Sequence, residues 1–184
     1  ALRLAEQTGG TLDRISATAN LAEVHVVRDE GATAIELVDQ CLAWVAETGA
    51  EEFRPELGYL RARACLQTER IEEARAALEE ARDLAASQGN LTIETLASSY
   101  LAEVMAGPDL LAEAVALAES QILRLREQGN DYELGRALVR HAARLDYQHA
   151  VPLMEEAGAI FTRLGARRDL VALVGDAGNA AATG

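Results

Sequence analysis

The sequence predicts an all-α fold of the helical-repeat type, a right-handed solenoid of antiparallel helix pairs. One observation behind this prediction is a fixed spacing: Gly9, Gly49, Gly89 and Gly129 follow one another at intervals of 40 residues. A constant period of this length indicates a stacked-repeat protein. The other observation is composition, because 49% of the 184 residues are hydrophobic while only 4% are aromatic. Alanine and leucine therefore supply the apolar surface, which favours close packing of helix against helix.

Alanines recur at fixed distances from the glycines, and they divide each repeat into two helices. One set lies 13 residues after a glycine, and a second set lies 15 residues before the next one. We expect about four repeats, over residues 10–49, 50–89, 90–129 and 130–165, with Gly165 closing the last. The alanines that define them are Ala22, Ala62, Ala102 and Ala142 in the first set, and Ala34, Ala74, Ala114 and Ala150 in the second.

The second repeat shows the expected elements most clearly. A first helix is predicted from about residue 52 to residue 68, with Pro55 in its first turn, where the missing N–H costs little. A short turn follows, and a second helix is predicted over residues 71–87 because apolar residues recur there at steps of three and four. Gly89 suits the left-handed position that ends such a helix.

The remaining repeats follow the same plan. Helices are expected over residues 12–27 and 32–48 in the first repeat, and over 91–106 and 110–128 in the third, where Gly107 and Pro108 mark the turn. The fourth repeat starts near Tyr132. It is one helical turn shorter than the others, and the missing turn falls near residues 145–148, where the two helices connect.

The two ends of the chain are expected to differ from the repeats. Residues 1–8 resemble the end of a second helix, so we expect a partial helix there and a chain cut from a longer array. Residues 166–174 are expected to start one further partial helix. The small Gly/Ala-rich residues 175–184 are predicted to form a flexible tail.

Charge and cysteine content limit the classes of function. The formal net charge is −13, which argues against general affinity for nucleic acid, since that needs clustered positive charge. No stretch has the apolar length of a membrane span, and no secretory signal is recognisable. Cys41 and Cys65 are expected to be reduced thiols that line the core, about 12 Å out of step on neighbouring helices. A cytoplasmic location follows from this expectation.

The second repeat resembles a tetratricopeptide repeat (TPR). Ala62 takes the small position of the first helix in that pattern, Cys65 takes the position usually held by an aromatic residue, and Ile71, Ala74, Leu78 and Ala81 fill the pattern of the second helix. The period of 40 exceeds the usual 34 of that family, so the resemblance is to the long-repeat type of large bacterial signalling and transcription regulators. It implies a solenoid that presents a surface to other proteins.

No pattern for catalysis or for a cofactor is present, so we predict that the chain is not an enzyme and binds no cofactor. The glycines do not match the pattern of a phosphate-binding loop, and neither cysteine has a histidine at a recognised spacing. His25 is expected to pack in the core. His141 and His149, with Asp146 between them, do not match a known metal-ligand pattern.

The best candidate site is the concave face, which the first helices of a solenoid line. We predict a mixed groove with Tyr59 and Arg63 near its centre, because aromatic and arginine side chains often anchor interfaces. The predicted function is a protein-interaction or regulatory module of a larger regulator, which contacts a protein, a peptide or another domain of its own chain. Self-association is possible, and neither nucleic acid nor membrane is expected. Two alternatives stay open: a small-ligand sensor that uses the groove, and a solvated face without a partner. The predicted partner-binding residues are Glu23, Tyr59, Arg63, Leu66, Glu103, Arg136, Val139 and Tyr147.

Overall fold

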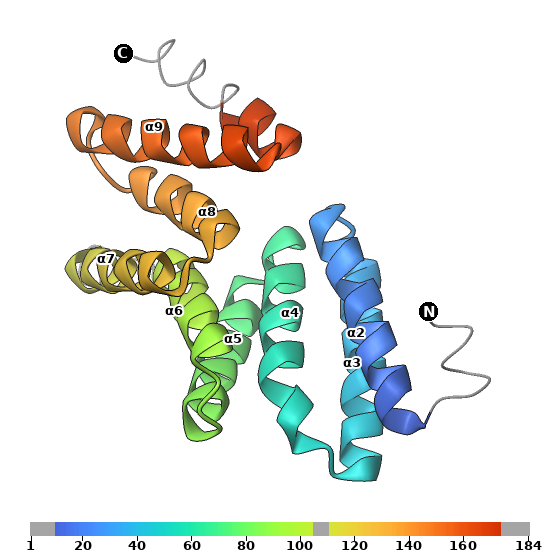
Figure 1. Cartoon of the computed structure of the whole chain (residues 1–184). Helices are drawn as coiled ribbons and strands as arrows, with labels where there is room; N and C mark the ends of the chain where they lie inside the picture. The colour runs from blue at the N-terminus through green and yellow to red at the C-terminus, as the bar shows by residue number, and fades with distance from the viewer. Residues whose placement is uncertain (1–9, 105–110, 174–184) are drawn as a thin grey trace. The chain divides into compact units, whose positions relative to one another are not determined.

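The computed structural model describes residues 10–104 and 111–173 of the chain. Within these ranges every regular element is helical (Figure 1). The helices belong to two compact units, one that ends at Val104 and one that follows it. Each unit has its own packing and is described by itself.

Over residues 10–104, the first unit contains five α-helices. They are α2 (Thr11–Val27), α3 (Gly31–Thr48), α4 (Arg54–Gln67), α5 (Ile71–Ser87) and α6 (Leu91–Val104), with the 3-10 turn η1 (Glu51–Phe53) before α4. Each helix packs against the next one along the chain. In addition, α2 contacts α4 and α4 contacts α6, so these three helices lie side by side. We call them the first-helix layer, because each is the first member of its helix pair.

The predicted helices agree closely with those of this unit. The second helix of the second repeat spans Ile71–Ser87 as expected, and α4 carries Pro55 within its first turn. The difference lies at the start of α4, where Glu51–Phe53 form a 3-10 turn in place of the first residues of the α-helix.

Glycine ends the second helices because the backbone there turns into the left-handed region. Gly49 ends α3 with φ 72°, and its N–H donates to the carbonyl oxygen of Val45 at 2.8 Å. Gly165 adopts φ 68° at the end of α9 (Tyr147–Leu164) in the second unit. Glycine has no Cβ atom, so it takes this conformation without the steric cost that other residues meet.

The core of the first unit lies between the helices of successive pairs. One cluster joins Ile15 of α2, Val38 and Cys41 of α3, and Leu57 of α4. A second joins Val26, Ala34 and Ile35 to Ala64, Cys65 and Ala74. Both cysteines are buried and free, in different clusters, as expected for thiols that are out of step along their helices.

The second unit contains α7 (Leu111–Gln128), α8 (Asp131–Ala142) and α9 (Tyr147–Leu164), and residues 167–173 are also helical. The helix α8 ends at Ala142, whereas α4 continues beyond the equivalent Ala62 to Gln67. The missing turn is therefore lost from the end of α8. Close packing of α8 on α9 is visible at Gly135, where an added Cβ would lie 2.7 Å from a ring carbon of Phe161.

Some predictions concern residues outside the described ranges. These are the partial helix 1–8, the end of the expected helix 91–106, the turn at residues 107–109 with the first residue of the expected helix 110–128, the last residue of the expected helix 166–174, and the tail 175–184. Among the described helices, none combines the length and the apolar character that crossing a membrane requires.

Candidate functional site

Two tyrosines and an arginine meet in the first-helix layer. The ring centroids of Tyr59 on α4 and Tyr100 on α6 are 5.7 Å apart in an edge-to-face arrangement. The guanidinium carbon of Arg63 lies 5.4 Å from the first ring centroid and 5.7 Å from the second. We call these three residues the Tyr–Arg cluster. Aromatic pairs and cation–π contacts of this kind stabilise a fixed geometry.

The sequence forms this cluster by helical spacing and close helix approach. Tyr59 and Arg63 are four residues apart, so they lie one above the other on the same side of α4. All three members of the cluster are buried: Tyr59 and Tyr100 are each 4% exposed, and Arg63 is 6% exposed. The cluster therefore joins α4 to α6 and holds the middle of the layer rigid.

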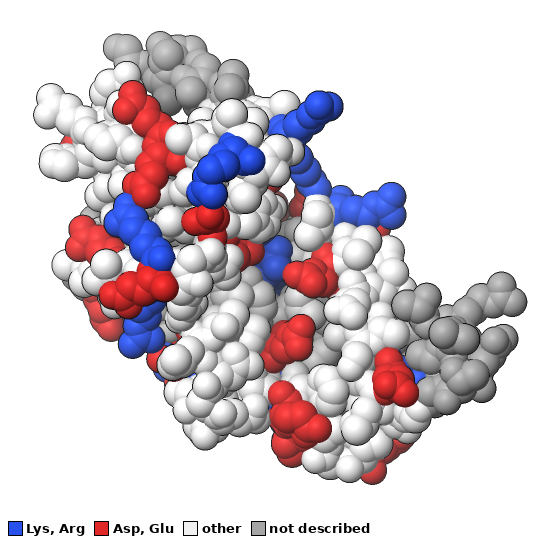
Figure 2. All heavy atoms as spheres, in the orientation of Figure 1, with Lys and Arg blue, Asp and Glu red and all other residues white. Residues whose placement is uncertain are grey.

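A pair of carboxylates lies on α2 and α4 of the same layer. Burial raises the pKa of Glu56 above its usual value, and the nearby Glu23 carboxylate raises it further. Both side chains reach solvent, although packing around Glu56 removes part of its hydration. Among residues 10–104 and 111–173, neither carboxylate has an ion-pair partner. Figure 2 shows acidic groups gathered over the region of α2 and α4.

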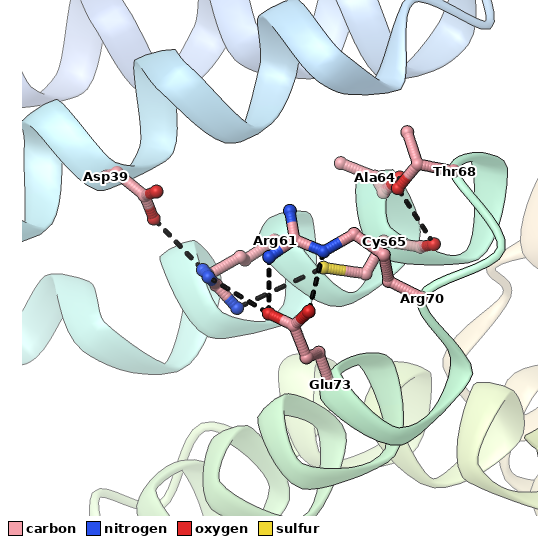
Figure 3. A network of polar contacts seen from close by, with 7 residues as sticks. All are labelled: Asp39, Arg61, Ala64, Cys65, Thr68, Arg70 and Glu73. Atoms are coloured by element: carbon pink, nitrogen blue, oxygen red, sulfur yellow. Dashed lines mark hydrogen bonds and ion pairs between the residues drawn. The ribbon is translucent and has the colours of Figure 1, made fainter.

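On the other side of α4, an ion-pair network connects three helices (Figure 3). Nε of Arg61 donates to Asp39 of α3 at 3.0 Å, and its Nη2 lies 3.6 Å from Glu73 of α5. Glu73 also accepts from Nε of Arg70 at 2.6 Å. This hydrogen bond is the main reason that the pKa of Glu73 is lowered. The network connects α4 to both α3 and α5.

The thiols are unsuited to nucleophilic chemistry. Burial raises the pKa of Cys41 to about 11. Burial also raises the pKa of Cys65, against the smaller opposite effect of Arg61 and Arg70. A thiol with a raised pKa stays protonated at neutral pH, and the thiolate is the reactive form.

The histidines lie in three different environments. His25 is partly buried and pairs with Glu30, so it is less enclosed than the expected core residue. His141 is buried on α8, and burial lowers its pKa. His149 is exposed, and its Nδ1 lies 2.8 Å from Asp146, which begins α9 as an N-cap. Within the described residues, no group of three or more such side chains could hold a metal ion.

The first unit brings together several of the predicted partner-binding residues. Glu23 on α2 and Glu103 on α6 are exposed. Tyr59 and Arg63 lie at the centre of the layer, where we expected them, but they are buried. Leu66 was expected to face away from the core. That expectation was wrong, because Leu66 packs partly buried against the cluster that contains Cys65.

The other predicted residues belong to the second unit. Arg136 and Val139 lie half-buried on α8. The guanidinium of Arg136 is 5.9 Å from the ring centroid of Tyr132 and 4.0 Å from Glu133. Tyr147 was expected on a first helix, which was wrong: it is the first residue of α9 and is 79% exposed. The shortening of α8 moves this residue from the first helix to the second.

Sequence reasoning missed two residues of this site. Tyr100 was missed because the repeat spacing of 40 relates Tyr59 to Ser99, one position earlier. Glu56 was missed because it looks like one of many surface acids. The signal that could have found it is its spacing on α4, since Glu56, Tyr59 and Arg63 fall on one side of a helix.

Comparisons with known proteins support the fold alone. No protein-family model and no curated protein matches the chain. Among solved structures, it is similar to a Podosopora anserina protein described as "putative kinesin light chain nearly identical TPR-like repeats", at 22% identity and TM-score 0.55. That match covers 90% of this chain and 88% of the other. A point variant of the same protein matches at 20% identity and TM-score 0.54, covering 89% and 92%. The chain therefore has a TPR-like helical-repeat fold, and the predicted all-α solenoid class is confirmed.

Proposed function

We propose that the chain is a non-catalytic interaction module that binds a protein or peptide partner on the first-helix layer of its first unit. The observation that carries this proposal is the pair of carboxylates, Glu23 and Glu56, on a layer held rigid by the buried Tyr–Arg cluster. A rigid surface loses little conformational freedom when a partner binds, so more of the contact energy appears as affinity.

The charge of this surface defines the chemistry of the partner. Glu56 has a raised pKa because its ionised form is poorly solvated and lies near a second negative charge. A lysine or arginine from a partner would offset both the poor solvation of the Glu56 carboxylate and its repulsion by Glu23. We therefore propose that the contacting segment of the partner is basic. Tyr59, Arg63 and Tyr100 would shape the layer from below, since they are buried.

A differential capture experiment tests the proposal. Proteins captured from the source cell by the unmodified chain are compared with those captured by a Glu23→Arg/Glu56→Arg variant. The Glu36→Arg variant, which changes an exposed position of α3, is the matched control. We expect proteins that the unmodified chain and the control both retain and that the double variant loses. They should also be released by moderate salt, because surface charge pairs are screened.

A set of captured proteins that the double variant holds as firmly as the unmodified chain would contradict the proposal. Circular dichroism melts of all three chains show whether each variant is folded. A melting temperature that stays within a few degrees of the unmodified chain makes loss of capture attributable to the surface, since exposed substitutions change stability little.

We further propose that this module forms one repeat domain over residues 1–174 and acts inside the cell as part of a larger regulator. The support is the repeat spacing, which runs through both units: Gly49, Gly89, Gly129 and Gly165 all adopt left-handed φ. The long period is the feature shared with regulator arrays. The complete gene tests this proposal, because an effector domain fused to the repeats would support a regulatory role and its absence would count against it.

A further inference from the structure

A pocket of about 310 Å³ lies on the side of α4 opposite the carboxylate pair, between α3 and α5. Its apolar lining consists of Leu42, Gly58 and three alanines of α5, Ala76, Ala77 and Ala81. Glu56 and Arg63 point away from this side, since they lie roughly 140–160° around α4 from Gly58 at about 100° per residue. The pocket is therefore separate from the surface of the proposed function.

The pocket exists where a large side chain is missing from the repeat pattern. The residue 12 positions before the closing glycine is Leu37, Leu117 or Leu153 in three of the repeats, but Ala77 in this one. Replacing leucine with alanine at a partly buried position leaves a space of side-chain size. Ala77 therefore leaves unfilled the space that a bulky apolar side chain takes in the other three repeats.

The neighbouring helices cannot move together to close the space. An added Cβ at Gly58 would lie 3.2 Å from the Cβ of Ala81 and 3.6 Å from the carbonyl oxygen of Ala77. The helices α4 and α5 are thus already in contact beside the pocket, and a Cβ atom at Gly58 would require Ala81 to shift by a few tenths of an ångström. The space is kept open by tight packing next to it.

Two ion pairs between α4 and α5 border the apolar lining. Nη2 of Arg54 lies 3.2 Å from Glu80, and Nη2 of Arg61 lies 3.6 Å from Glu73. The side chains of Arg54 and Glu80 are 41% and 60% exposed, so this border is open to solvent. Figure 3 shows the Arg61 end, where Asp39 and Glu73 both reach the guanidinium.

The charges of the border select for an uncharged occupant. Arg54 and Arg61 are matched by Glu80 and Glu73 within the lining, and Asp39 and Glu51 add further negative charge beside them. An anion would have to displace these carboxylates. Guanidinium N–H groups lie in the plane of the group, so carboxylates that occupy the plane leave its faces available for stacking on an aromatic ring.

We propose that this pocket binds a neutral aromatic side chain, of the size of the tryptophan indole, presented by a partner protein. The volume suits one such ring, the floor supplies apolar contact, and the arginines at the two borders supply cation–π attraction. A free polar metabolite fits less well, because the charged groups of the lining are already paired with one another. A tryptophan in a peptide brings no further polar group into the pocket.

The test is an NMR titration of the ¹⁵N-labelled chain with N-acetyltryptophanamide. We expect saturable shifts at the amides of Gly58, Ala76 and Ala77, with a dissociation constant on the order of 1 mM, as for other ligands of this size. N-acetyltryptophan, which carries a carboxylate, should bind more weakly. N-acetylleucinamide should also bind more weakly, because it lacks the ring.

Two variants of α5 make the test specific. Ala77→Leu restores the residue that three repeats carry, so it should fold and should weaken binding by about tenfold or more. Ala86→Leu adds the same side chain at an exposed position of α5 outside the pocket and should leave binding unchanged. If Ala77→Leu is unfolded, Ala76→Leu replaces it, since Ala76 is exposed and lines the same pocket.

Each outcome of the titration either supports or overturns the proposed aromatic pocket. Saturable shifts that the pocket-filling variant loses and the control retains support the proposal. Absence of saturable shifts in the unmodified chain overturns it, and so does equal affinity in the pocket-filling variant. Equal affinity for the leucine and tryptophan probes overturns the assignment to an aromatic side chain.

Discussion

Backbone conformation distinguishes a small set of residues in this chain. Glycine occupies the left-handed positions that follow the second helices, with φ between 66° and 72°. Among the described residues other than glycine, Asp29 with φ 65° and Glu69 with φ 58° adopt the same conformation at the turns within helix pairs. A Cβ atom at such a position costs roughly 1–2 kcal/mol.

Gly89→Ala should therefore lower the free energy of unfolding by about 1–2 kcal/mol. No atom lies within 4 Å of the added Cβ at Gly89, so the loss would come from backbone conformation and not from a clash. Urea denaturation measures the change. Glu69→Gly is the matched counterpart and should not lose stability, because it removes the same cost. An unchanged midpoint for Gly89→Ala would show that the turn adapts to the substitution.

Leu78→Ala should lower the free energy of unfolding by about 2–5 kcal/mol. Leu78 is fully buried on α5, at the position where the repeat pattern predicts a large apolar residue. The control is Leu123→Ala on α7, where the leucine is 56% exposed and the change should stay within about 0.5 kcal/mol. Equal losses at the two positions in thermal and urea denaturation would contradict the burial of Leu78.

The sequence indicated which helix lies at the centre of the site, but it did not indicate that Tyr100 joins Tyr59 and Arg63 there. Tyr59 and Arg63 were expected near the middle of the first-helix layer because they belong to the first helix of the second repeat, and both lie on α4. Their burial could not be predicted, because it depends on Tyr100, which the repeat spacing does not relate to Tyr59. Side-chain burial in an array depends on how neighbouring repeats differ, whereas the period describes only what they share.

At the scale of elements, helix bounds followed from the sequence wherever two signals agreed. The bounds of α5 were predicted because the apolar stripe and Gly89 mark the same helix. The loss of one turn near α8 was also predicted, from the shortened interval between Ala142 and Ala150. The position of Tyr147 on α9 was not predicted, since spacing alone does not say which of the two helices loses the turn.

The carboxylate pair between α2 and α4 should make stability depend on pH. Burial and the Glu23 carboxylate raise the pKa of Glu56, so the folded chain binds this proton more tightly than the unfolded chain does. The stability that this group contributes is fully present below the unfolded pKa, and it is lost as pH rises through the folded pKa. Glu56→Gln cannot ionise, so the variant should not lose this stability as the pH rises.

We expect Glu56→Gln to be more stable than the unmodified chain at pH 7, and the two to be nearly equal at about pH 4. Urea midpoints at both pH values measure the difference. Glu23→Gln should give a smaller gain at pH 7, because the Glu23 carboxylate is the second cause of the shift after burial. A constant difference between the Glu56→Gln variant and the unmodified chain at all pH values would argue against the raised pKa.

At the scale of the whole molecule, stability should be local to each unit. In a repeat protein each helix pair contacts mainly its neighbours, so folding free energy is close to a sum over pairs and their interfaces. Both hydrophobic clusters that join α2, α3, α4 and α5 lie entirely within the first unit. The ion-pair network of Asp39, Arg61 and Glu73 lies there too.

A fragment of residues 10–104 should therefore fold without the rest of the chain. We expect a helical circular dichroism spectrum and a single cooperative urea transition, because the fragment keeps the packing of each helix from α2 to α6 on the next one. Leu78→Ala made in the fragment should again cost about 2–5 kcal/mol, since the contacts of that residue are kept. A fragment that shows helix but no cooperative transition would mean that the two units fold only together, and that stability in this chain is not a local property of its helix pairs.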